Sequence, residues 1–205
     1  MDDDDIKLLE RGLPTNTDIR NFLQGRGMVL SDLSCLIGID RGIFITTSPH
    51  PAESFFIYRT EPEEDKVLFL FDEFNIPHFP RIEKTDSYSV VKLPTATKPL
   101  YIFKFSEKRP TDGTYIGAFE IMALLGKFLK HLRTEIQALP QNLSIASFAI
   151  APSNDDWMVH LIPPLLMGEV LSPEMLEKQF LETFNKIDPL NYHKGQVQEL
   201  IRSYL

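Results

Sequence analysis

The pattern of apolar and polar positions predicts a first part made of short helices and a hairpin. Residues 6–11 and 17–26 have helical spacing, and residues 31–37 fit a third short helix that begins at a serine cap. Residues 42–47 and 54–60 are rich in β-branched and aromatic side chains, which is typical of paired strands. Three short helices followed by a hairpin is the element order of a winged helix.

The middle of the chain predicts mainly strands. Residues 67–71 are an unbroken apolar run, which is consistent with a buried strand, and residues 72–87 are expected to be a loop or a crossing segment. Residues 88–93 and 100–105 have strand patterns on either side of a short polar stretch. These two segments predict a hairpin.

The strongest predicted element is a helix at residues 115–138. Its polar stripe holds Glu120, Lys127 and His131, so we expect one narrow face in solvent. The remaining face is wide and apolar, which predicts that the helix is mostly buried. The apolar residues that keep helical spacing are Ala118, Met122, Leu125, Leu129, Leu132 and Ile136.

The last part of the chain adds a second hairpin and two helices. They are predicted at residues 144–151 with 157–162, at 172–186 and at 195–204. Together the elements predict an α+β fold in which a mainly antiparallel sheet packs on the long buried helix 115–138. We expect two domains, a helical and hairpin subdomain at residues 1–62 and an α+β domain at residues 63–205.

Composition narrows the class of protein. The 205 residues are 43% hydrophobic and 24% charged, which suits an ordinary globular chain. A single cysteine, Cys35, excludes an internal disulfide framework and a zinc site made of cysteines. No apolar run reaches the length of a membrane span, and Met1 followed by four aspartates is neither a signal nor a transit peptide. We therefore expect a cytoplasmic protein with no membrane partner.

The net charge of −8 is unevenly spread along the chain. Residues 1–80 carry 7 basic and 15 acidic side chains, residues 81–133 carry 10 and 5, and residues 134–205 carry 4 and 9. The acidic first part argues against nucleic acid as a partner, because duplex binding needs many lysines and arginines that face phosphates. The basic middle part either attracts phosphates or acidic partners or complements the acidic parts of the same chain.

Common catalytic and metal motifs do not occur in the sequence. No two of the five histidines have the spacing of a helical metal pair, and no Gly-x-Ser-x-Gly or Walker-type loop is present. We therefore expect no metal site, and no catalytic residue can be assigned from motifs alone. The histidines are His50, His78, His131, His160 and His193.

Residues 88–166 combine two strands, a buried helix, two more strands and an exit that contains prolines. Lys104 lies in the middle of the second strand, and Glu120 lies one turn into the helix. This order resembles the small lobe of the protein-kinase-like fold, which aminoglycoside and lipopolysaccharide kinases share. The resemblance implies that Lys104 meets ATP phosphates and that Glu120 holds its ammonium group, so both are candidate nucleotide-binding residues.

Other catalytic parts of that family have no counterpart in this pattern. No glycine-rich loop lies between residues 67 and 93, and no His-Arg-Asp-like or Asp-Phe-Gly-like motif follows residue 166. The leading hypothesis is therefore a non-catalytic regulatory or interaction protein with a kinase-small-lobe-like core, a protein partner and no cofactor. One alternative is a nucleotide-dependent phosphotransferase fragment or relic, which would need ATP and magnesium. The other is a winged-helix transcriptional regulator.

Overall fold

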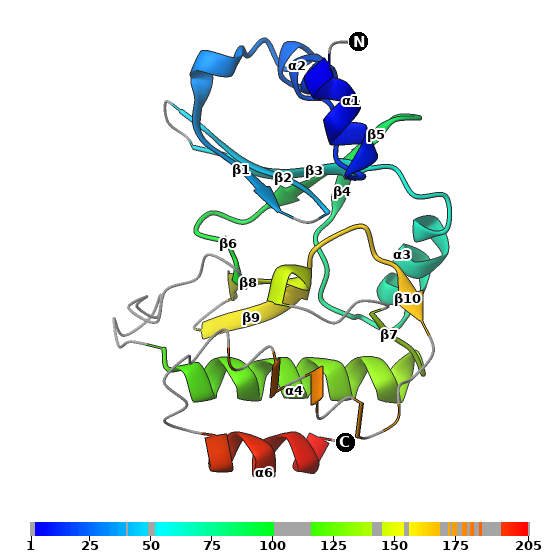
Figure 1. The fold of residues 1–205 in the computed structure, drawn as a ribbon, viewed down its shortest axis with the longest axis vertical. Coiled ribbons are helices and arrows are strands. Elements are labelled where there is room, and N and C mark those ends of the chain that lie inside the picture. The colour runs from blue at the N-terminus through cyan, green and yellow to red at the C-terminus, as the bar shows by residue number, and fades with distance from the viewer. Residues whose placement is uncertain are drawn as a thin grey trace. The chain divides into compact units, whose positions relative to one another are not determined.

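The computed structural model describes residues 3–39, 41–48, 52–100, 116–140, 145–153, 156–168 and 194–204, together with single positions between 172 and 185. Within these residues the chain has an α+β fold of helices and antiparallel sheets, as the sequence predicts (Figure 1). It divides into two compact units. The first unit comprises Met1–Glu64 and Phe79–Thr97, and the second comprises Asp65–His78 and Lys98–Leu205.

A five-stranded antiparallel sheet forms the centre of the first unit. Its strands lie in the order β1-β2-β3-β5-β4, so β1 and β4 are its two edges. The first three strands follow one another along the chain as a meander, and β5 lies between β3 and β4. The strands are β1 (Leu33–Ile39), β2 (Gly42–Thr47), β3 (Ser54–Arg59), β4 (Arg81–Lys84) and β5 (Tyr88–Leu93).

Two helices precede this sheet, α1 (Asp3–Glu10) and α2 (Asn16–Gln24), close to the two that the sequence predicts. A capping box sets the start of α2. The Thr15 Oγ1 accepts from the Asp18 N–H at 3.1 Å, and the Asp18 Oδ2 accepts from the Thr15 N–H at 2.8 Å. The two bonds satisfy N–H groups that have no partner within the helix, so the chain enters α2 at a defined point.

One apolar core joins α2 to the sheet. Ile19, Phe22 and Leu23 face the sheet because they stand at positions i, i+3 and i+4 of the helix. The Phe22 ring meets the Phe55 ring edge to face, with centroids 5.2 Å apart, which is an arrangement that aromatic pairs prefer. The sheet residues buried in this core are Ile43, Ile45, Phe55, Ile57, Tyr88 and Val90.

Arg26 ties the chain just after α2 to strand β4. Its Nη1 lies 2.8 Å from the Glu83 Oε2, and its guanidinium carbon lies 4.1 Å from the centroid of the Phe22 ring. The Tyr88 hydroxyl donates to the Glu83 Oε1 at 2.7 Å. Burial, and next this hydrogen bond, raise the pKa of Tyr88 to about 12, so the hydroxyl keeps its proton and remains a donor.

The prediction of a helix at residues 31–37 is wrong. A single 3-10 turn, η1, covers Leu30–Asp32, and the next seven residues form β1, which pairs with β2 as far as Ile39↔Gly42. A short apolar segment suits either structure, and here pairing with β2 across a two-residue connection stabilises the strand. The winged-helix element order therefore lacks its third helix.

The buried strand predicted at residues 67–71 is also wrong, because this segment lies in helix α3 (Glu64–Glu73). Phe71 is fully buried, whereas Phe69 is 68% exposed. Residues two apart share one face of a strand but point in nearly opposite directions on a helix, so this contrast follows from the helix. An unbroken apolar run of this length does not distinguish the two structures.

The long helix predicted at residues 115–138 is supported in part by α4 (Ala118–Glu135). Its end is set by Gln137, which takes a φ of +57° and cannot continue the helix. The apolar face is buried as predicted, and Lys127 and His131 are exposed. The residues that α4 contributes to the core of the second unit are Ile121, Met122, Leu125, Phe128, Leu129 and Leu132.

Short strands and a last helix complete the second unit. The predicted second hairpin is present as β8 and β9, which pair from Phe148↔Leu161 to Ser153↔Asp156, and the predicted last helix is present as α6 beside α4 (Figure 1). None of the helices in the described ranges has the length and apolar character that a bilayer crossing demands. The elements are β6 (Lys98–Pro99), β7 (Leu139–Pro140), β8 (Phe148–Ser153), β9 (Asp156–Leu161), β10 (Met167–Gly168) and α6 (Lys194–Tyr204).

The hairpin predicted between residues 88–93 and 100–105 is not formed by β5. That strand pairs with β3 on one side and with β4 on the other, so neither of its edges is open over Ser89–Val91. The short strand β6 pairs instead with β8 in the second unit. Residues 101–105 lie outside the described residues, as does most of the helix predicted at 172–186.

The division of the chain differs from the predicted domains 1–62 and 63–205. Residues 79–97 belong to the first unit, because β4 and β5 complete the sheet that β1–β3 begin. The segment predicted to be a loop at 72–87 contains the edge strand β4. Two segments distant in the sequence therefore build one sheet, which a single cut in the sequence cannot represent.

Replacing Leu125 by alanine is expected to lower the free energy of unfolding by about 2–5 kcal/mol, because this 1%-exposed side chain fills the core around α4. Lys127→Ala, on the exposed face of the same helix, is the matched control and should change it by less than about 0.5 kcal/mol. Urea unfolding followed by circular dichroism measures both values. Equally small losses in the two variants would contradict a core role for α4.

Candidate functional site

Only one member of the predicted nucleotide-binding pair is described, because Lys104 lies outside the described residues. Glu120 is exposed in the first turn of α4, and its Oε2 accepts a hydrogen bond from the Gly117 N–H at 2.8 Å. A carboxylate suits this place because the first N–H groups of a helix lack partners within it. Glu120 thus has a visible role at the helix start, and its pairing with Lys104 stays a prediction.

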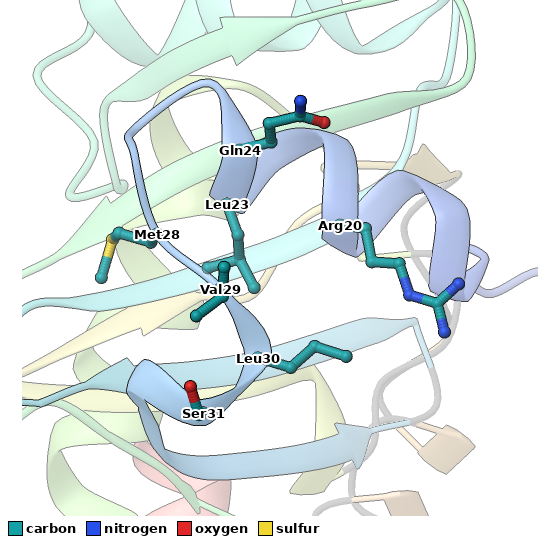
Figure 2. A pocket seen from close by; sticks show the side chains of 7 residues that line it. All are labelled: Arg20, Leu23, Gln24, Met28, Val29, Leu30 and Ser31. Atoms are coloured by element: carbon teal, nitrogen blue, oxygen red, sulfur yellow. The ribbon is translucent and has the colours of Figure 1, made fainter.

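A mainly apolar pocket of about 540 Å³ lies in the first unit, between α2 and η1 (Figure 2). Its volume is within the range of roughly 300–1,000 Å³ that binding pockets occupy. The polar residues that line it are Arg20, Gln24 and Ser31, and Figure 2 shows Arg20 and Leu30 extending to the same side. The apolar lining residues are Leu23, Met28, Val29 and Leu30.

The pocket is formed because the chain turns back sharply after α2. Gly27 takes a φ of +69°, a left-handed conformation that glycine adopts at little cost. The Met28 N–H then donates to the Leu23 carbonyl at 2.9 Å, and the Gly27 N–H donates to the Gln24 carbonyl at 3.0 Å. This pair of bonds is the Schellman pattern, which satisfies the last carbonyls of a helix and reverses the chain direction.

Exposed apolar side chains form the outer wall of the pocket. The Asp32 Oδ2 accepts from the Val29 N–H at 2.8 Å and so stabilises the turn that carries them. Val29 is 61% exposed and Leu30 is 47% exposed, whereas Leu23 beneath them is 1% exposed. Arg20 is the one charged residue among the described lining residues, and it has no ion-pair partner in the described part of the chain.

The sequence signals the turn but not the pocket. Gly25 and Gly27 mark the end of the helix predicted at 17–26, and an apolar triplet follows directly. The pattern does not tell which members of the triplet enter the core. Met28 is half-buried and packs against the core of the first unit, whereas Val29 and Leu30 stay exposed.

A smaller cavity of about 330 Å³ in the first unit brings two carboxylates together, but their hydrogen bonds indicate a structural role. Asp5 accepts from the Asn16 N–H at 2.8 Å and from the Thr17 hydroxyl at 3.0 Å, which ties α1 to the start of α2. The Asp18 Oδ1 accepts from the Ser87 hydroxyl at 2.9 Å, in addition to the capping bonds of its other oxygen. Each carboxylate thus holds helix-start N–H or hydroxyl groups in place, which is a structural role.

A third buried carboxylate, Glu64, is also held by its neighbours. Its Oε2 accepts from the Tyr58 hydroxyl at 2.9 Å and lies 3.5 Å from the Arg81 Nη1. Burial, and next the charge of Glu64, raise the pKa of Tyr58 far above its ordinary value, so the hydroxyl remains a donor. The carboxylate is thus hydrogen-bonded and paired with a cation, which is what a buried charge requires.

The neighbours of two histidines of the second unit, His78 and His160, show what role each can have. The His78 Nδ1 donates to the Ile76 carbonyl at 2.9 Å, and its Nε2 lies 3.4 Å from the Asp72 Oδ1. Burial, with a smaller effect of His78, lowers the pKa of His160 to about 4. Across the described ranges, no group of three or more histidine, cysteine, aspartate or glutamate side chains is arranged to hold a metal ion.

Comparison with known proteins assigns the chain to no family: neither a family model nor a curated protein sequence matches it. The function has therefore to be inferred from the geometry itself. Of the two cavities described, the one between α2 and η1 has an open apolar wall, whereas the carboxylates of the other are held by structural hydrogen bonds. We therefore take the α2–η1 pocket as the candidate functional site.

Replacing His160 by glutamine is expected to remove part of the acid sensitivity of the protein. The pKa of His160 is about 4 in the folded state, against an ordinary value of 6.5 in the unfolded chain. The neutral imidazole therefore makes its full contribution to the free energy of unfolding above about pH 6.5, and this contribution is lost as the pH falls toward 4. Between about pH 7.5 and pH 5, the wild type should lose about 2 kcal/mol more than the variant.

Urea unfolding of both proteins at the two pH values measures this difference. The exposed His131 provides the matched control, because His131→Gln should leave the wild-type pH dependence unchanged. Parallel losses in wild type and His160→Gln would contradict the assigned environment of His160.

Proposed function

We propose that the chain is a non-catalytic interaction protein whose first unit binds a partner protein at the α2–η1 pocket. One observation carries this proposal: Val29 and Leu30 are 61% and 47% exposed beside a cavity whose floor is the buried Leu23. Single exposed apolar side chains are ordinary on protein surfaces. Neighbouring ones around a concave site are typical of binding surfaces, because a partner can cover them together.

Burial of these side chains supplies a driving force for binding. Complete burial of a valine or leucine side chain contributes about 1.5–3 kcal/mol, so two that are about half exposed offer roughly 2 kcal/mol together. The polar residues Arg20, Gln24 and Ser31 lie around the same pocket. They supply hydrogen-bonding groups that orient a partner, as the polar rim of a protein interface does.

The two alternative functions draw on fewer observations. The phosphotransferase hypothesis rests on Lys104 and Glu120, and the described interaction of Glu120 is a cap at the start of α4. The winged-helix hypothesis needs a helix where β1 runs from Leu33 to Ile39. Neither alternative makes use of the α2–η1 pocket.

A random peptide library, displayed on phage and selected on the immobilised full chain, tests the proposal. Selected peptides are expected to bind, and Leu30→Asp should weaken their binding at least about tenfold because it places a charge in the apolar wall. Ile82→Asp is the matched control, since Ile82 is 41% exposed on β4 at the opposite edge of the same sheet. Isothermal titration calorimetry measures the affinities.

Two results would count against the proposal. Selected peptides that bind Leu30→Asp as tightly as the wild type would exclude the pocket as the binding site. Absence of any peptide enriched over an unrelated protein would contradict the interaction function. A rise in melting temperature with ATP and magnesium would instead favour the phosphotransferase hypothesis, because a ligand that binds the native state raises its stability.

A further inference from the structure

The two edges of the sheet in the first unit differ in chemistry. Strand β4 (Arg81–Lys84) has four residues, three of them charged. Strand β1 (Leu33–Ile39) has seven residues, and none of them is charged or is a proline. Proteins commonly protect an exposed edge with charges, prolines or short strands, since its unpaired N–H and C=O groups can pair with another chain. Of these protections β4 has two and β1 has none; each strand also has one irregularity of register, between Leu33 and Cys35 in β1 and between Arg81 and Glu83 in β4.

The residues of β1 also leave an apolar surface open beside its edge. Leu36 pairs with Ile45 and Gly38 pairs with Ile43, so both lie on the face of the sheet that α2 covers further along. Leu36 is nevertheless 50% exposed. A Cβ added at Gly38 would meet no atom within 4 Å, so the space above this part of the strand is free among the described atoms.

Along the chain, this strand directly follows residues of the α2–η1 pocket. The pocket residues Leu30 and Ser31 belong to the turn that leads directly into β1. Exposed apolar side chains therefore recur from Val29 to Leu36 on consecutive elements, the turn and the edge strand. Arg20 lines the same pocket and has no ion-pair partner in the described part of the chain.

We infer that β1 pairs with an extended segment of the partner protein, which adds a sixth strand to the sheet. Main-chain hydrogen bonds along β1 hold the segment, and one of its apolar side chains enters the α2–η1 pocket. A carboxylate on the segment pairs with Arg20, since an acidic group complements the one charge that lines the pocket. This inference rests on the proposed function and names the class of partner, an extended apolar peptide that carries a carboxylate.

A second copy of the chain fits this edge less well. The residues of the first unit carry 9 basic and 14 acidic side chains, so two first units repel one another. A partner segment needs only one carboxylate beside Arg20, so this overall repulsion does not weigh against it as it does against a second acidic first unit.

Hydrogen exchange measured by NMR on the full chain, free and saturated with a selected peptide, tests the inference. We expect alternate backbone amides of Leu33–Ile39 to exchange at least about tenfold more slowly in the complex, because an added strand pairs with every second residue. The amides of β4 should not change. Arg20→Glu should weaken binding at least about tenfold and Arg20→Lys far less, because the lysine keeps the charge.

The outcomes separate this inference from the proposed function. Peptide binding that depends on Leu30 but leaves the exchange rates of the β1 amides unchanged would overturn the inferred sixth strand. The α2–η1 pocket would then still be the binding site. If the selected peptide bound Arg20→Glu and the wild type with equal affinity, the inferred pairing of a partner carboxylate with Arg20 would be overturned. A chain that sediments as a dimer, and that Leu36→Glu converts to monomer, would show that a second copy occupies the edge and would also overturn the inference.

Discussion

Burial of one face of α2 against the five-stranded sheet is the interaction on which the rest of the first unit depends. Phe22 of the helix and Phe55 of β3 meet edge to face at the centre of this core, and Ile19 and Leu23 extend it along the helix. Because a helix of nine residues cannot stay folded alone in water, this contact also stabilises α2 itself. The capping box at Thr15 and Asp18 then determines where the helix starts.

The same packing sets the position of the α2–η1 pocket. Leu23 is held in the core, Gly27 reverses the chain immediately afterwards, and Arg26 is bound by Glu83 and the Phe22 ring. The residues that follow must therefore pass beside the end of α2 and cannot join the core completely. Val29 and Leu30 remain exposed for this reason, so the candidate site is a consequence of how the helix ends.

Sequence patterning identified the elements whose period is unambiguous and failed where an apolar run was short. Strands β2, β5 and β9 and the helices α2, α4 and α6 are at or near the predicted positions. Residues 31–37 were predicted as a helix and are mostly strand, and residues 67–71 were predicted as a strand and are helix. The reason is that a few consecutive apolar residues fit a strand and a helix equally well. The candidate site was not predicted, since the pattern gives no measure of exposure for the residues after Gly27.

The sequence by itself determined the α+β class, the buried face of α4 and the stop after α2, because helical spacing, capping residues and glycines act locally. Only the tertiary structure decided which strands share a sheet, since β4 (Arg81–Lys84) and β5 complete a sheet that begins with β1 at Leu33. It also decided that β1 lies at an edge and that Leu36 is half-exposed there. Strand neighbours and exposure depend on contacts between distant segments, and those contacts have no local signature in the chain.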